Sequence, residues 1–239
     1  MFETISRKFQ LKFKDRAASG SILAEILKDR LKKEHIVVLG IPRGGVITAD
    51  FVARKISNAV KSVDFDIIIS RKLTDRHNKE QAIGAVMEDG TTYLDEEIIS
   101  MSQIPPEYLE KEKAKQIQEI KRRKHLYCAN KLFNEYEHLE DKTTILVDDG
   151  AATGATLIAA CRWLRMKHTP KRLVIAVPVV PKSTVKLLEQ ESDAVEVVIS
   201  PSSIFRSVEQ FYQDFEQVPD DRVMNILRTR QLLNEKPNS

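Results

Sequence analysis

Two adjacent acidic residues, Asp148 and Asp149, directly follow the apolar run at residues 145–147. A continuous apolar run of this kind is typical of a central parallel strand that is covered on both faces. Ligands of open α/β sheets bind beyond the carboxyl ends of such strands, so we expect both carboxylates to face a ligand. Since neighbouring strand residues point to opposite faces, the end of the strand must bend for this to happen. Paired carboxylates suit vicinal hydroxyls or a hydrated divalent cation.

The segment after the acids, residues 150–156, consists only of Gly, Ala and Thr. Small side chains let an anion approach the backbone closely, and the first amides of a following helix can point at it. A helix is expected because apolar residues recur at helical spacing from Leu157 to Leu164. An isolated turn rich in Gly and Asp is common in α/β proteins, where Asp148 would only cap the helix. The complete order of strand, acids, small-residue loop and helix instead predicts a site for a phosphorylated sugar.

A second anion-binding loop is predicted at residues 40–45, between a strand pattern at residues 36–39 and a helical pattern at residues 46–56. Its glycines permit close approach of the backbone to an anion. Arg43 offers a forked donor that is permanently charged. Taken alone, this Pro-Arg-Gly-Gly segment could equally be a turn that precedes a helix.

Two cations, Arg71 and Lys72, follow a strand predicted at residues 65–69, and the polar segment 75–81 comes next. Cations at the end of a strand suit a pyrophosphate group, although Arg71 could equally form a structural ion pair. The polar segment has the composition of a mobile surface loop, and a solvated turn explains it equally well.

Residues 145–156 resemble the phosphoribosyl pyrophosphate (PRPP) signature of type I phosphoribosyltransferases. Other motifs occur in the order of one less-studied branch, whose members stand alone or are fused to hydrolase domains and whose acceptor is generally not assigned. These motifs are Phe13-Lys14-Asp15-Arg16, residues 22–27, Pro42-Arg43-Gly44-Gly45, Arg71-Lys72-Leu73, Ala82-Ile83-Gly84-Ala85-Val86, residues 174–178 and residues 211–215.

The resemblance implies a site for each part of PRPP. Asp148 and Asp149 would hold the ribose hydroxyls and the loop would hold the 5′-phosphate. The ribose 5-phosphate set is Asp148, Asp149, Ala151, Ala152, Thr153, Gly154, Ala155 and Thr156. The pyrophosphate set is Arg43, Gly44, Arg71 and Lys72, next to a cis peptide between Pro42 and Arg43. The residues assigned to catalysis are Asp148, Asp149, Arg43 and Lys72.

The reaction implied by the resemblance is displacement at the anomeric carbon of PRPP by a nitrogenous acceptor, with loss of pyrophosphate. Mg²⁺ is the implied cofactor, near Asp148 and Asp149 through ribose hydroxyls or water, because it prefers substrate oxygens to an all-protein cage. The segment after Lys72 would close over the substrate and exclude water.

The acceptor itself is left open by the sequence. Purine-salvage relatives usually carry Asp at the first position of the phosphate loop, where this chain has Ala152. The pocket walls could be residues 177–179 and the C-terminal aromatic side chains, which could equally form a core or dimer patch. These aromatic residues are Phe205, Phe211, Tyr212 and Phe215.

Composition bounds the class of protein. The chain has 239 residues, of which 42% are hydrophobic, and its strand and helix patterns alternate. We therefore expect an α/β fold with a twisted, mostly parallel sheet flanked by helices, a flexible loop and a small hood region. The expected organisation is a single domain, with a lead-in at 1–34, a core at 35–200 and a tail at 201–239.

Charge and cysteine usage exclude several classes. A net charge of +3 is nearly balanced and does not indicate nucleic acid. The two cysteines, Cys128 and Cys161, lack the spacing of a zinc site or a disulfide framework. No long apolar run and no signal-peptide core is present, so we expect a cytoplasmic protein that is not bound to a membrane. The charged segment 107–124 predicts a solvated helix packed on one side, or a contact in a homodimer.

Two other functions remain compatible with the sequence. One is a regulatory protein that binds PRPP or a nucleotide without transferring anything, and the other is a partner domain of a hydrolase. A dinucleotide-binding Rossmann protein is disfavoured because no GxGxxG motif follows the first strand.

Overall fold

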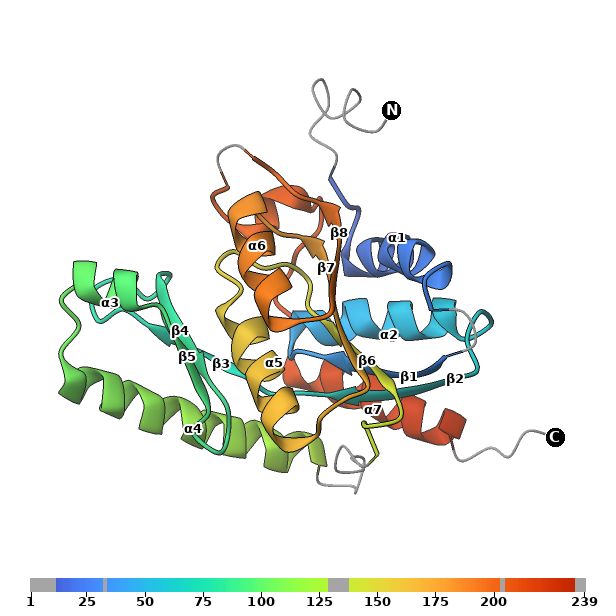
Figure 1. Cartoon of the computed structure of the whole chain (residues 1–239), viewed down its shortest axis with the longest axis horizontal. Helices are drawn as coiled ribbons and strands as arrows, with labels where there is room; N and C mark the ends of the chain where they lie inside the picture. Colours follow the sequence, from blue (N-terminus) through green and yellow to red (C-terminus); the bar gives the residue numbers. More distant parts are fainter. Residues whose placement is uncertain (1–11, 32–33, 129–137, 203–204, 235–239) are drawn as a thin grey trace.

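A parallel sheet forms the centre of the computed structural model, which describes residues 12–31, 34–128, 138–202 and 205–234. The sheet has five strands in the order β2-β1-β6-β7-β8, and every pairing in it is parallel (Figure 1). The strands are β1 (His35–Gly40), β2 (Ser62–Ile67), β6 (Thr143–Val147), β7 (Arg172–Val179) and β8 (Ala194–Ile199). The expected α/β class with a mostly parallel sheet is confirmed.

Helices cover both faces of this sheet, which explains why its central strands are mostly apolar. On one face, α1 (Arg16–Lys28) and α2 (Gly44–Ile56) share a buried cluster with Ile36 and Val38, in which α2 contacts β1 and α1 contacts β7 and β8. On the other face, α5 (Ala155–Lys167) and α6 (Lys182–Glu191) share a buried cluster with Val37 and Leu39, and α6 contacts α5 and β8. Helix α7 (Asp220–Asn234) crosses below and contacts α2 and α4 (Figure 1). Alternate residues of one strand therefore anchor opposite helical layers.

A smaller antiparallel sheet lies to one side of the main sheet (Figure 1). It is built from β3 (Arg71–Thr74), β4 (Ala82–Val86) and β5 (Thr92–Leu94). Two helices follow, α3 (Glu96–Met101) and the long α4 (Pro106–Cys128), which packs against β3. Helix α4 buries Ile120 and Tyr127 almost completely and also buries Glu112 and Arg123, whereas most of its other charged residues are exposed. The expectation of a charged helix packed on one side is confirmed.

The region around the end of the second strand differs in two details from the expectation. The strand expected at residues 65–69 spans Ser62–Ile67. Arg71 and Lys72 follow the end of β2, as expected, but they lie inside a further strand, β3, paired with Val86 and Ala85 of β4. The strand β3 forms because it pairs with β4 in a hairpin, and no local sequence pattern indicates this pairing. The polar segment 75–81 is the turn of this hairpin, closed by a 3.0 Å hydrogen bond from the Asp75 amide to the Gln81 carbonyl oxygen. Its closure over a substrate stays a prediction.

The last helix of the described chain, α7, spans Asp220–Asn234 within the expected tail. Across the described parts of the chain, no helix is both long enough and apolar enough to cross a membrane. The division into one domain stays a prediction.

Candidate functional site

Both predicted anion-binding loops start at the same edge of the parallel sheet. Strands β1 and β6 are neighbours, and their terminal residues Gly40 and Val147 are register partners. Just beyond the strands, the Ile41 amide donates to the Val147 carbonyl oxygen at 2.9 Å. The sheet topology therefore brings together two loops that are far apart in the sequence.

The glycines of the first loop lie directly against the acid pair that precedes the second loop. A Cβ atom on Gly44 would lie 1.8 Å from Oδ2 of Asp149, and one on Gly45 would lie 2.8 Å from Cα of Asp148. Any side chain at these positions would collide with the acid pair, so this approach requires glycine. The peptide bond between Pro42 and Arg43 is cis, in agreement with the resemblance.

The two carboxyl groups of the acid pair have different surroundings. Asp148 is partly exposed when the whole residue is considered, but its carboxyl group is buried. This burial raises the pKa of Asp148 well above its usual range, and the charge of Asp149 acts in the same direction. Arg16 contacts the other acid, where its Nε donates to Oδ2 of Asp149 at 2.6 Å. One carboxyl group therefore faces a fixed cation, while its neighbour is biased toward the neutral form.

The small-residue loop is fixed at its first residues and open at its end. The Ala151 amide donates to the Val179 carbonyl oxygen at 3.0 Å, and the Thr184 hydroxyl donates to the Ala152 carbonyl oxygen at 2.6 Å. Gly154 is the N-cap of α5 in the left-handed conformation, with φ of 73° and no side-chain cap. The first turn of α5 therefore presents amides from which an anion can accept hydrogen bonds.

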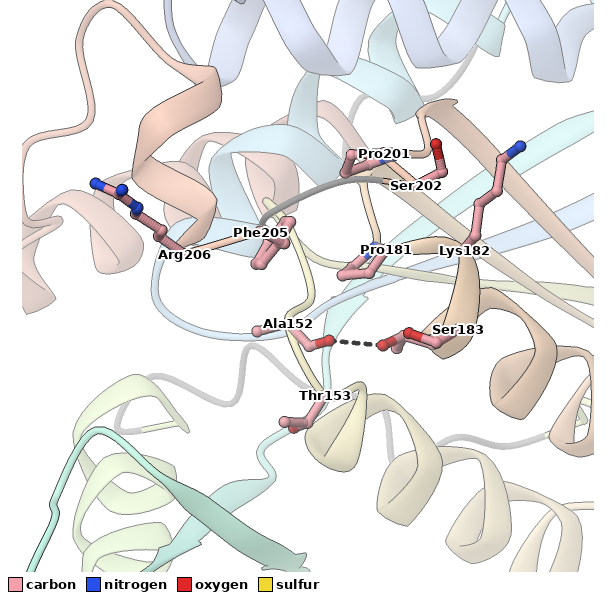
Figure 2. A pocket seen from close by; sticks show the side chains of 10 residues that line it. Ala152, Thr153, Pro181, Lys182, Ser183, Pro201, Ser202, Phe205 and Arg206 are labelled. Carbon is pink, nitrogen blue, oxygen red and sulfur yellow. Dashed lines mark hydrogen bonds between the residues drawn. The ribbon is translucent and has the colours of Figure 1, made fainter.

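A cavity of about 490 Å³ opens beside this loop (Figure 2). Ala152 and Thr153 form its border with the loop, and Lys182 and Arg206 extend from opposite sides of it (Figure 2). The remaining lining residues are Pro181, Ser183, Thr184, Pro201, Ser202 and Phe205. The space between the phosphate loop and α6 is therefore large enough for a small planar molecule.

The comparison with known proteins decides the family. Residues 12–216 match the phosphoribosyl transferase domain family. The chain belongs to this family. It is 33% identical over 215 residues to proteins from two strains of Mycobacterium tuberculosis that are named as candidate phosphoribosyl transferases. The match covers 90% of this chain but 46% of each relative, so the chain spans about half their length. The crystal structure of TT1426 from Thermus thermophilus is 34% identical, with a TM-score of 0.70 and coverage of 90% of this chain and 97% of that one.

The predicted pyrophosphate residues of this phosphoribosyl transferase domain are only partly brought together. Arg71 and Lys72 are successive strand residues, so their side chains leave β3 on opposite faces. Arg71 turns to α4, where its Nε donates to Oε1 of Gln116 at 3.0 Å. The charge of Lys72 reaches Asp148, whose pKa it lowers against the larger effect of burial. Lys72 is therefore the better placed of the two for a ligand bound at the acid pair.

Arg43 lies near a carboxylate that the sequence did not indicate. Its Nη1 is 3.8 Å from Oδ1 of Asp220, the first residue of α7. The Tyr127 hydroxyl donates to the same Asp220 carboxylate at 2.5 Å, and Arg122 lies 3.5 Å from it. An anion bound by Arg43 would therefore compete with Asp220 for the guanidinium.

Sequence reasoning also missed the contacts that Arg16 and Tyr212 make with Asp149. The motifs that contain them were recognisable, but neither residue was assigned to the acid pair.

Of the four C-terminal aromatic residues, only Phe205 lines the cavity. Phe211 and Tyr212 are buried in a cluster with Phe13, so the expected aromatic wall is reduced to one ring. Phe215 lies under Arg16, whose Cζ is 3.8 Å from the ring centroid.

The residues of this domain that could hold a metal ion are few. Within the described ranges, no group of three or more His, Cys, Asp and Glu side chains is arranged to hold one. Asp148 and Asp149 remain as a pair of carboxylates at the site. Such a donor set fits Mg²⁺, since this ion keeps several waters and takes most of its other ligands from substrate phosphates.

Proposed function

We propose that the chain transfers the 5-phosphoribosyl group from PRPP to a nitrogenous acceptor and releases pyrophosphate. The observation that carries the proposal is the contact between the glycines of one anion-binding loop and the acid pair of the other. PRPP needs both features at once, because its ribose hydroxyls, 5′-phosphate and pyrophosphate surround one anomeric carbon. Family membership supports the reaction type, and the acceptor is the unassigned part.

Each group of residues has a separate task in this reaction. Asp148 and Asp149 would hold the ribose hydroxyls, while the amides at the start of α5 would hold the 5′-phosphate. The acceptor nitrogen forms a bond to the anomeric carbon as the bond to the pyrophosphate oxygen breaks. The departing pyrophosphate carries the growing negative charge, which Arg43, Lys72 and the Gly44 backbone would stabilise. The acceptor nitrogen then loses its proton to solvent or to the departing pyrophosphate.

Mg²⁺, when bound, would neutralise part of the charge of the pyrophosphate. Asp148 and Asp149 would hold the ion through water or through the ribose hydroxyls. The carboxylates must then be ionised, whereas burial favours the neutral form of Asp148. Binding of magnesium and PRPP is therefore expected to release protons from the protein.

The cavity beside Ala152 is the proposed acceptor site. It adjoins the phosphate loop, and Phe205 offers a ring on which a planar base could stack. An acidic side chain at position 152, which purine-salvage relatives use as the base, is missing. The acceptor nitrogen is therefore expected to be one that needs little help in losing its proton.

A calorimetric titration of PRPP into the protein, with and without Mg²⁺, tests this proposal. The matched variant carries Asp148→Asn and Asp149→Asn, which keep the shape of the side chains but remove both charges. Magnesium-dependent binding that the variant loses would support the site. Pyrophosphate release would then be screened with purines, pyrimidines and simple amines. Folded wild-type protein that fails to bind PRPP would refute the proposal, and binding without release from any acceptor would leave a PRPP-binding regulatory protein.

A further inference from the structure

Asp149 is held by residues from both ends of the chain. Arg16, the first residue of α1, donates from Nε to Oδ2 of Asp149 at 2.6 Å, and both side chains are at most 15% exposed. The Tyr212 hydroxyl donates to the Asp149 carbonyl oxygen at 2.6 Å. The carboxylate and the main chain of Asp149 are thus fixed by different elements.

Arg16 is itself restrained on two further sides. Its Nη1 donates to the Glu216 carbonyl oxygen at 2.9 Å, and its Cζ lies 3.8 Å from the centroid of the Phe215 ring. A guanidinium held at three points has little freedom to follow a moving carboxylate. The position of Asp149 is therefore set by Arg16, and Arg16 is set by the segment around residues 215–216.

Asp149 also cannot relax toward the neighbouring loop. Its Oδ2 would lie 1.8 Å from a Cβ on Gly44, so the carboxylate already fills the space above that glycine. If Arg16 were lost, the carboxylate would turn away or take up water, and the contact with the loop would change. A displacement of about 1 Å in a binding group can reduce activity by about a hundredfold.

We infer that Arg16 is a positioning residue that holds the Asp149 carboxylate in the orientation needed to bind the ribose hydroxyls of PRPP. The inference rests on the proposed function and assigns a role to the N-terminal helix. It also explains why the fold brings residues 212–216 back to the sheet edge, since this segment supports both Arg16 and Asp149.

The chain contains a matched control for this inference. Arg230 of α7 donates from Nε to Oδ1 of Asp50 at 2.6 Å, and its Cζ lies 5.0 Å from the Phe65 ring centroid. This pair is also an arginine–aspartate ion pair of similar burial, with exposed fractions of 13% and 4%, and Asp50 has a second cation in Arg54 at 3.0 Å. It joins α7 to α2, and neither residue belongs to an anion-binding loop. A loss of PRPP binding that merely reflects a broken buried ion pair would therefore occur in both variants.

The experiment titrates PRPP with Mg²⁺ into the wild type and the variants Arg16→Gln, Arg16→Lys and Arg230→Gln, and records the melting temperature of each. We expect Arg16→Gln to lose more than about tenfold in affinity and Arg16→Lys to recover part of that loss. Arg230→Gln should melt at a lower temperature but bind PRPP within about twofold of the wild type.

Several outcomes would overturn the inference. Folded Arg16→Gln that binds PRPP as well as the wild type would do so, as would an equal loss of affinity in Arg230→Gln. If Arg16→Gln does not fold, Arg16→Lys decides, because unchanged affinity in that variant would show that the forked geometry is not needed. Absence of PRPP binding by the wild type refutes the proposed function itself, and the inference falls with it.

Discussion

Replacing Asp148 with Asn should stabilise the protein while it removes ligand binding. The pKa of Asp148 is raised by burial and, to a smaller extent, by the charge of Asp149. An aspartate in an unfolded chain ionises at about pH 3.9. Between that value and the higher folded pKa, the folded protein keeps a proton that the unfolded chain releases. Stability therefore falls as the pH rises through this window, and the loss is complete above the folded pKa.

The magnitude follows from the linkage relation. Each unit by which folding raises the pKa costs about 1.4 kcal/mol of unfolding free energy at neutral pH. Asn has nearly the same shape, and its side-chain oxygen can still accept the hydrogen bond that the Asp149 amide makes to Oδ1 at 2.8 Å. Removing the penalty should raise the melting temperature by roughly 2–4 °C for each kcal/mol in a domain of this size.

The assay is thermal unfolding of the ligand-free wild type and Asp148→Asn between about pH 4 and pH 8. We expect the variant to melt at a higher temperature at neutral pH and the difference to close as the pH falls to about 4. Asp66 in β2 provides a control, because burial also raises its pKa. Asp66→Asn should stabilise in the same way but keep PRPP binding. Equal or lower stability of Asp148→Asn at neutral pH would refute the reasoning.

Three further predictions concern the cavity, the pyrophosphate side and the core. Phe205→Ala should raise the KM for the acceptor while PRPP affinity stays within about twofold, and equal KM values would exclude Phe205 from the acceptor site. Asp220→Asn should strengthen binding of magnesium pyrophosphate in calorimetry, since it removes the carboxylate that competes for Arg43; weaker binding would contradict this. Leu164→Ala should cost about 2–5 kcal/mol in urea unfolding, because Leu164 of α5 is fully buried, and a loss below about 1 kcal/mol would show that the core collapses around the gap.

Much of the site could be predicted from the sequence because its parts are local. The apolar strand, the acid pair, the small-residue loop and the following helix are consecutive in the chain, so Asp148 and Thr153 are close whatever the topology. The same is true of Arg43 and Gly44 after β1. Alternation of strand and helix patterns was enough to predict a parallel sheet with both faces covered.

Other features depended on which strands and helices become neighbours. The two anion-binding loops meet because β1 pairs with β6. The order of the strands in the chain does not specify this pairing. The position of Lys72 within β3 depends on its hairpin partner, and for that reason this strand was not predicted. Arg71 faces α4 for the same reason.

The sequence by itself determined the chemistry that this protein can offer: two carboxylates, two loops suited to anions and the strands that carry them. Only the tertiary structure decided how these groups are held. Arg16 and Tyr212 reach Asp149 from opposite ends of the chain, and Asp220 reaches Arg43 from the last helix. Such contacts join residues without any periodic or motif relation, because they arise from the packing of α1, α7 and the C-terminal segment against the sheet edge.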